Sequence, residues 1–249
     1  MDEAQQTVAA GGPAADPTAA RARARRDFLR SAGLGGAALA LAACGGGVER
    51  ALLAPGTPTS PAPSPAVIGP GGSVTLDFSN EIDVLNYAYA LEQLEAAFYI
   101  RVTNAPQFAT IFAANEQRIL RDLRAHEVVH RDFFAAAIPA AQRIPALTPD
   151  FSAINFGSRA SVLAAARDFE DLGVSAYNGA GRYLKTNVYL TLAGKIVSVE
   201  ARHASAIRDV LSPNTGDFAP SAYDAPKTPQ EVLAAADPFI VEPITAVNT

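Results

Sequence analysis

In each of two stretches of the chain, a glutamate is followed seven residues later by a tyrosine. The first reads Leu91-Glu92-Gln93-Leu94-Glu95-Ala96-Ala97-Phe98-Tyr99, and the second reads Phe169-Glu170-Asp171-Leu172-Gly173-Val174-Ser175-Ala176-Tyr177. The apolar residues around each stretch recur with the period of a helix, and each glutamate lies on the apolar face. The two stretches therefore predict two helices that turn a carboxylate toward the core.

A second pattern alternates with the first. Glu127 is followed three residues later by His130, and Glu200 is followed in the same way by His203. Both pairs also lie on the apolar stripe of a helical segment. The order Glu-x6-Tyr, Glu-x2-His therefore occurs twice, which predicts two copies of a helix hairpin.

The apolar stripes predict four helices, over residues 81–102, 116–137, 162–184 and 189–211. From Glu92 to Glu127 is 35 residues and from Glu170 to Glu200 is 30, and either distance fits one helix, a short turn and a second helix that meet at one level. The stretch between the copies carries three prolines and a glycine, which predicts one long crossover: Pro139, Pro145, Pro149 and Gly157. We expect an all-α fold, an antiparallel four-helix bundle with one long crossover.

Each of the four predicted helices turns at least one acid toward the core. A buried carboxylate without a partner is costly, so it takes up a proton or finds a partner. Lysine and arginine are scarce on these inner faces. Metal cations would satisfy the whole set together: Glu92, Glu127, His130, Glu170, Glu200 and His203.

These motifs resemble the ferritin-like di-metal carboxylate superfamily, and within it the exported ferritin-like domain family that includes desiccation-related proteins. The resemblance covers residues 80–211 and extends to a segment at 228–240. It implies a pair of metal ions, iron or manganese, in the middle of the bundle. It also implies oxidation chemistry with O₂ or peroxide, of the ferroxidase, peroxidase or catalase type.

The resemblance implies a role for each of the six side chains. Glu92 and Glu170 would each be a terminal ligand of one ion. The two ions would be bridged by Glu127 and Glu200. His130 and His203 would each supply an imidazole ligand to one of the two ions.

Three further residues lie close to these ligands in the predicted helices. Tyr99 and Tyr177 lie two turns from a glutamate on the same face, and they are either hydrogen-bond donors to the ligands or plain core aromatics. Glu95 lies one turn from Glu92 and could replace it as a ligand, although the spacing to the tyrosine favours Glu92.

Two alternatives stay open from the sequence. His126 and His130 match the His-Glu-x-x-His motif of zinc proteases, but no third zinc ligand of that class follows, and we expect His126 to be structural. The second alternative is a structural or stress-protective surface protein without catalytic activity, because a fold alone does not imply turnover.

Composition limits the class of partner. Hydrophobic residues make up 49% of the chain and its formal net charge is −5, which favours a sizeable core and excludes a protein held to nucleic acid by basic patches. The single cysteine excludes an internal disulfide framework. The oligomeric state is not determined by the sequence.

The first 44 residues indicate an export signal. Arg25 and Arg26 are followed by Phe-Leu, by a short stretch rich in Gly, Ala and Leu, and by Leu-Ala-Ala-Cys ending at Cys44. This order is typical of a twin-arginine signal with a lipobox, so we expect a protein outside the cytoplasm, attached to the cell membrane through lipidated Cys44.

The chain is thus predicted to have four parts. The signal covers residues 1–44, a Pro/Gly/Ser-rich tether covers 45–72, and the bundle covers 73–212. The remaining segment, 213–249, is rich in proline and is expected to be mostly extended. Within it, Thr228, Pro229 and Glu231 predict one short helix that begins with a capping box.

Overall fold

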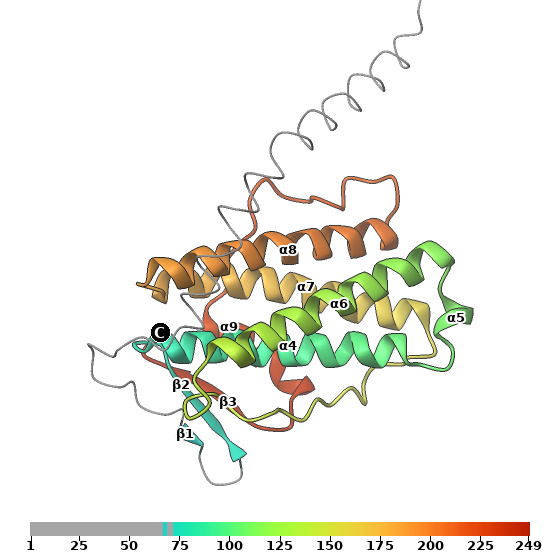
Figure 1. Ribbon diagram of the computed structural model, residues 1–249. Coiled ribbons are helices and arrows are strands. Elements are labelled where there is room, and N and C mark those ends of the chain that lie inside the picture. The colour runs from blue at the N-terminus through green and yellow to red at the C-terminus, as the bar shows by residue number, and fades with distance from the viewer. Residues whose placement is uncertain (1–66, 69–71) are drawn as a thin grey trace, which may run out of the picture. The chain divides into compact units, whose positions relative to one another are not determined.

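The computed structural model describes residues 67–68 and 72–249 (Figure 1). The predicted signal, Cys44 and most of the predicted tether lie outside these residues. Within the described part, four long helices pack together: α4 (Glu81–Thr103), α6 (Ala114–Ala137), α7 (Arg159–Ala180) and α8 (Asn187–Leu211). The predicted four-helix bundle is confirmed.

The bundle consists of two hairpins (Figure 1). Helix α4 packs most extensively on α6, which it reaches through the short helix α5 (Phe108–Ile111), and α7 packs most extensively on α8 through the 3₁₀ turn η2 (Gly181–Tyr183). The partners in each hairpin run antiparallel, whereas α6 and α7 run in the same direction, because the long segment between them returns along the bundle (Figure 1).

Helix α4 is buried along nearly its whole length, because the crossover segment after α6 lies against it. The side-chain amide of Asn86 donates to the Gln142 carbonyl at 2.7 Å, and the Ile144 N–H donates to Asn86 Oδ1 at 3.0 Å. Two turns further on, the Leu147 N–H donates to Gln93 Oε1 at 2.9 Å. None of the helices in the described part of the chain is long and apolar enough to span a membrane.

Helix α7 begins and ends at residues suited to those positions. The Ser158 side chain accepts from the Ser161 N–H, which caps the helix. The apolar stripe predicted a helix as far as Leu184, but α7 ends at Ala180 and η2 follows. The C-cap residue of α7 is Gly181, and glycine is among the poorest helix formers. Leu184 is nevertheless buried.

The segment after α8 forms a short helix, a 3₁₀ turn and a strand: α9 (Pro229–Ala236), η3 (Asp237–Phe239) and β3 (Ile244–Val247). Thr228 and Glu231 form the predicted capping box of α9. Strand β3 pairs in parallel with β2 (Val74–Asp77), and β1 (Val67–Ile68) pairs antiparallel with β2. The sequence analysis did not predict this small sheet, and β1 falls within the predicted tether.

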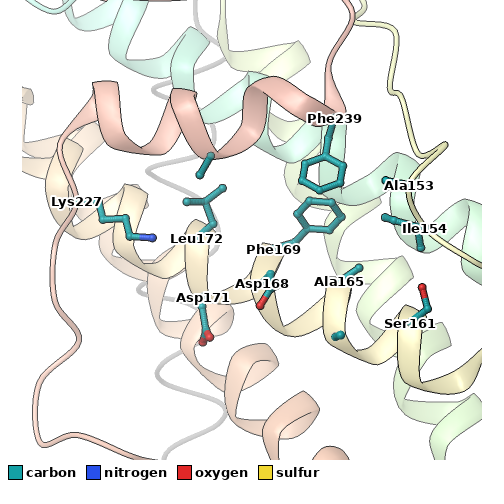
Figure 2. Close-up of a pocket in the computed structure, with 12 residues that line it drawn as sticks. Ala153, Ile154, Ser161, Ala165, Asp168, Phe169, Asp171, Leu172, Lys227 and Phe239 are labelled. Atoms are coloured by element: carbon teal, nitrogen blue, oxygen red, sulfur yellow. The ribbon is translucent and has the colours of Figure 1, made fainter.

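The C-terminal segment lies against α7. The Lys227 N–H donates to the Ser175 carbonyl at 3.0 Å, and Phe239 meets Phe169 edge to face with ring centroids 4.9 Å apart (Figure 2). A Cβ added at Gly179 would lie 1.8 Å from the Lys227 carbonyl oxygen, so this contact requires glycine. A cavity of about 550 Å³ beside Phe169 and Lys227 lies between α7, α9 and the crossover, and none of the six predicted ligands lines it.

Candidate metal centre

The structure brings all six predicted ligands together inside the bundle. One comes from α4, two from α6, one from α7 and two from α8. The side chains of all four glutamates are fully buried, His203 is 4% exposed and His130 is 12% exposed. The convergence that the alternating motifs predicted is therefore present: Glu92, Glu127, His130, Glu170, Glu200 and His203.

The six residues form two overlapping groups that could each hold a metal ion. One group consists of Glu92, Glu127, His130 and Glu200. The other consists of Glu127, Glu170, Glu200 and His203. In each group one ligand atom per residue lies within 4.8 Å of the others. Because Glu127 and Glu200 belong to both groups, two ions held here would be neighbours that share two carboxylates.

Both imidazoles direct Nδ1 toward the carboxylates. His130 Nδ1 lies 2.9 Å from Glu200 Oε1 and 3.3 Å from Glu127 Oε2. His203 Nδ1 lies 2.7 Å from Glu127 Oε1 and 3.5 Å from Glu170 Oε2. Nitrogen and carboxylate oxygen together are a donor set that suits iron and manganese.

Several of these atoms are buried and, although close to one another, lack a partner in hydrogen-bonding geometry in the described part of the chain: Glu92 Oε2, Glu127 Oε1, Glu170 Oε2, both carboxylate oxygens of Glu200, and His203 Nδ1. Buried polar atoms in folded proteins nearly always have a partner. These unpaired atoms belong to the same two groups, so one kind of ligand, a cation, would satisfy them all. The residues present therefore fit a metal centre.

Two tyrosines link the hairpins at the centre. The Tyr99 hydroxyl of α4 donates to Glu170 Oε1 of α7 at 2.5 Å, and the Tyr177 hydroxyl of α7 donates to Glu92 Oε1 of α4 at 2.5 Å. Each tyrosine thus holds the glutamate of the other hairpin, and leaves that glutamate's second oxygen free. The sequence predicted tyrosines close to the ligands but did not predict that the bonds cross.

The electrostatics of the centre follow from burial and from the two imidazoles. Burial raises the pKa of Glu170 to about 8 and raises the pKa of Glu92 well above its ordinary value. Burial opposes ionisation of Glu127 as well, but contacts with His130 and His203 outweigh it and lower the Glu127 pKa to about 2. Despite burial, neighbouring carboxylates raise the pKa of each of these histidines to about 12.

Glu95 is a fifth acid beside the centre. It is 3% exposed, and burial raises its pKa well above the ordinary value. A Cβ added at Gly173 would lie 2.9 Å from Glu95 Oε1 and 3.6 Å from Glu200 Oε2, so the Glu95 carboxyl occupies space beside the glycine of α7. Glu95 belongs to neither group of candidate ligands, whereas Glu92 belongs to one of them.

His126 also stands outside both groups but contacts one of their members. Its Nδ1 lies 2.9 Å from His203 Nε2, and the two rings stack with centroids 5.1 Å apart. From the sequence we expected only a structural role for this residue, because it lies at the edge of the apolar face of its helix. A helical period does not show that it reaches α8. The arrangement does not support the zinc-protease alternative, in which His126 and His130 would bind the same ion.

The centre lies below a small pocket at the surface between α6 and α8. The pocket has a volume of about 260 Å³ and is lined by His126, Val129, His130, Val199, Arg202 and His203. Val129 at its rim is 64% exposed. The edge of the His130 ring is thus the point at which one candidate group comes closest to solvent, while the carboxylates below stay buried.

A helical bundle with this cluster defines a class of proteins that can hold metal ions between carboxylates and imidazoles. The chain matches the family model of the ferritin-like domain over residues 80–213, which is more than half of its length. The chain therefore belongs to the ferritin-like domain family. None of the curated proteins matches it in a sequence comparison.

Proposed function

We propose that this protein binds two iron or manganese ions in the bundle and oxidises or reduces small molecules there. The observation that supports this most strongly is the set of buried, unpaired carboxylate and imidazole atoms that belongs to two overlapping groups. A buried acid is normally paired with a positively charged side chain. In this cluster the acids outnumber the two imidazoles that could pair with them.

In this proposal Glu92 and His130 hold one ion, and Glu170 and His203 hold the other. The remaining two glutamates, which both groups share, would contribute to both positions. When bound, the ions would exchange electrons with O₂, peroxide or Fe(II) by changing between two oxidation states.

The chain itself contributes orientation and exclusion of water. Tyr99 and Tyr177 each fix one oxygen of a terminal glutamate and leave the other for the ion. The aromatic rings of Phe98 and Phe169 pack edge to face behind Tyr99, with Phe98 5.0 Å from each of the other two ring centroids. The pocket over His130 supplies the route by which a small reactant would arrive.

The proposal extends to the location of the protein. The arginine pair, the apolar stretch and Cys44 at the end of Leu-Ala-Ala-Cys support export and attachment to the cell membrane by lipidation. The same sequence features, with the segment at 228–240, support a place among exported proteins of the desiccation-related type. In that setting, removal of peroxide or of Fe(II) would be the protective activity.

Metal content tests the proposal first. Plasma mass spectrometry on the purified full chain should find about two ions of iron or manganese per chain. The double variant Glu127→Ala/Glu200→Ala should lose both ions, because both positions depend on these bridges. The matched control is Asp122→Ala/Asp209→Ala, which removes two exposed acids from the same two helices and should keep the metal. Unchanged metal content in the first variant would overturn the proposal.

Turnover is tested separately. The loaded protein should consume peroxide, or oxidise Fe(II) with O₂, and the bridge variant should not. A protein that holds both ions but has neither activity would instead have the non-catalytic role. Zinc alone, with a protease activity that disappears in His126→Ala but persists in the Glu200→Ala variant, would favour the zinc-protease alternative.

A further inference from the structure

The pocket over the centre is built from three pairs of matching residues. Each pair holds the same position relative to Glu127 on α6 and to Glu200 on α8: His126 with Val199, Val129 with Arg202, and His130 with His203. The two Glu-x-x-His segments thus face each other across the pocket. Any difference within a pair is a difference between the two candidate metal positions.

Below the pocket the candidate ligands of the two positions are alike. Each has one glutamate of its own, held by the tyrosine of the opposite hairpin at 2.5 Å. Each has one imidazole whose Nδ1 points at the carboxylates, and both share the same two bridging glutamates. The ligand atoms alone would therefore make the two ions nearly equivalent.

The pair of His126 and Val199 breaks this equivalence. His126 Nδ1 lies 2.9 Å from His203 Nε2, with the two rings stacked at an interplanar angle of 12°. If His203 binds an ion through Nδ1, that nitrogen carries no proton, so Nε2 carries it and donates to His126. A partner of this kind fixes the tautomer and the direction of a metal-binding imidazole.

His130 has no such partner. The matching residue is Val199, whose side chain has no hydrogen-bonding group, and no hydrogen bond to His130 Nε2 is present in the described part of the chain. His130 is also three times as exposed as His203, at 12% against 4%. Its ring is thus held less firmly and lies closer to water.

We propose that the two metal positions differ in affinity because His126 acts as a positioning residue for only one of them. The position of Glu170 and His203 is the tighter one, and its ion stays in place. The position of Glu92 and His130, beside the pocket, is the weaker one, and its ion exchanges first. This inference rests on the proposed function, since it concerns the ions of the same centre.

A titration of the metal-free full chain with Co²⁺ tests this inference. Binding is monitored by calorimetry and by the absorption bands of the bound ion. The wild type should bind two ions with two separate dissociation constants. His126→Ala should raise the smaller constant by about 10- to 100-fold, the usual effect of removing a partner of a metal-binding histidine, and leave the larger one unchanged. Val199→Ala, the matched control, should change neither.

Two further pairs of variants assign the steps and separate hydrogen bonding from packing. Glu170→Gln should remove the tighter step and Glu92→Gln the weaker one. Because an asparagine oxygen can accept the His203 Nε2–H, His126→Asn should regain part of the affinity that His126→Ala loses. A loss that asparagine does not reduce would overturn the positioning role.

Other outcomes distinguish this inference from the proposed function. Two equal constants in the wild type, or a tighter step that His126→Ala leaves unchanged, would overturn the inference while the metal centre stands. An equal loss in Val199→Ala and His126→Ala would also overturn it. If neither Co²⁺, Mn²⁺ nor Fe²⁺ binds to the wild type, the proposed function fails and the inference fails with it.

Discussion

The two hairpins of the bundle carry the same ligands but differ in what surrounds them. Hairpin α4–α6 and hairpin α7–α8 each supply one glutamate, one Glu-x-x-His pair and one tyrosine to the centre. Around this shared set, His126 matches Val199 and Glu95 matches Gly173. The comparison teaches that both hairpins supply the same candidate ligands, whereas the residues next to these ligands differ between the two hairpins.

The outer coverings of the hairpins differ as well. The crossover segment lies along α4 and bonds to Asn86 and Gln93, whereas the C-terminal segment lies on α7 and bonds to Ser175. In the part of the chain that the structure describes, no comparable segment covers α6 or α8 over much of their length, and only one stripe of each helix is buried. In this part of the chain the candidate metal centre thus has two shielded sides, α4 and α7, and two sides nearer to solvent, α6 and α8, with the pocket between the latter two.

The largest effect is expected from pH on the metal-free protein. Burial raises the pKa of Glu170 to about 8 in the folded state, from about 4.5 in the unfolded chain. The stability contributed by its protonated form is therefore complete below pH 4.5 and is lost as the pH rises through 8. Each pKa unit of difference between the folded and unfolded states changes the free energy of unfolding by about 1.4 kcal/mol. The free energy of unfolding should therefore fall by several kcal/mol over this pH range. Chemical denaturation of the metal-free protein at pH 5 and pH 8.5 measures it.

Three neighbouring groups contribute to stability in the same direction. Burial raises the pKa of Glu92, and the carboxylates raise those of His130 and His203 to about 12, so their contributions also fall as the pH rises. Glu170→Gln should make the loss of stability between pH 4.5 and 8 smaller, because the amide does not titrate and only the other groups still do. Metal should stabilise the protein more at pH 8.5 than at pH 5, since the ligands must lose protons to bind it. A metal-free protein that gains stability from pH 5 to 8.5 would contradict this account.

The next largest effect concerns the outer face of α7, which the C-terminal segment covers. Gly179→Ala places a methyl group 1.8 Å from the Lys227 carbonyl oxygen, a backbone atom that cannot move without displacing the C-terminal segment. We expect a loss of about 3 kcal/mol in the free energy of unfolding, measured in urea. Gly194→Ala on α8, where no other described part of the chain lies within 4 Å of the added Cβ, is the control and should not destabilise. Equal stability of the two variants would show that the segment does not dock as described.

The smallest effect tests the likeness of the hairpins. Tyr99→Phe and Tyr177→Phe each remove one hydroxyl that donates to a buried carboxylate at 2.5 Å. Each should cost about 1.5 kcal/mol of stability, and the two losses should agree, because the bonds are related by the repeat. Thermal unfolding of both variants measures this. A loss in only one of them would mean that the repeat does not extend to the tyrosines.

Much of the centre could be predicted because its spacing fixes it. A glutamate on the apolar face of a helix must point inward, and a histidine three residues on lies on the same face. Four such helices of similar length place their inner acids at one level. Glu92 and Glu170 could therefore be chosen from sequence, and Glu92 preferred to Glu95, before any contact was known.

The contacts across helices could not be predicted in this way. The reach of His126 to His203 depends on the rotation of α6 relative to α8, and the crossing of the tyrosine bonds depends on how α4 meets α7. Helical period describes one segment at a time and contains neither angle. The sheet of β1, β2 and β3 was missed for a related reason, because its strands are short and come from opposite ends of the bundle segment.

The sequence by itself determined the four helices, the long crossover, the short helix α9 and the six inward side chains, because each follows from local periodicity, capping and spacing. Only the tertiary structure decided which histidine gains a partner, that the tyrosine bonds cross between the hairpins, and where the centre comes close to solvent. The physical reason is that a residue's direction from its own helix axis is set locally, whereas the partner it meets depends on how separate helices pack.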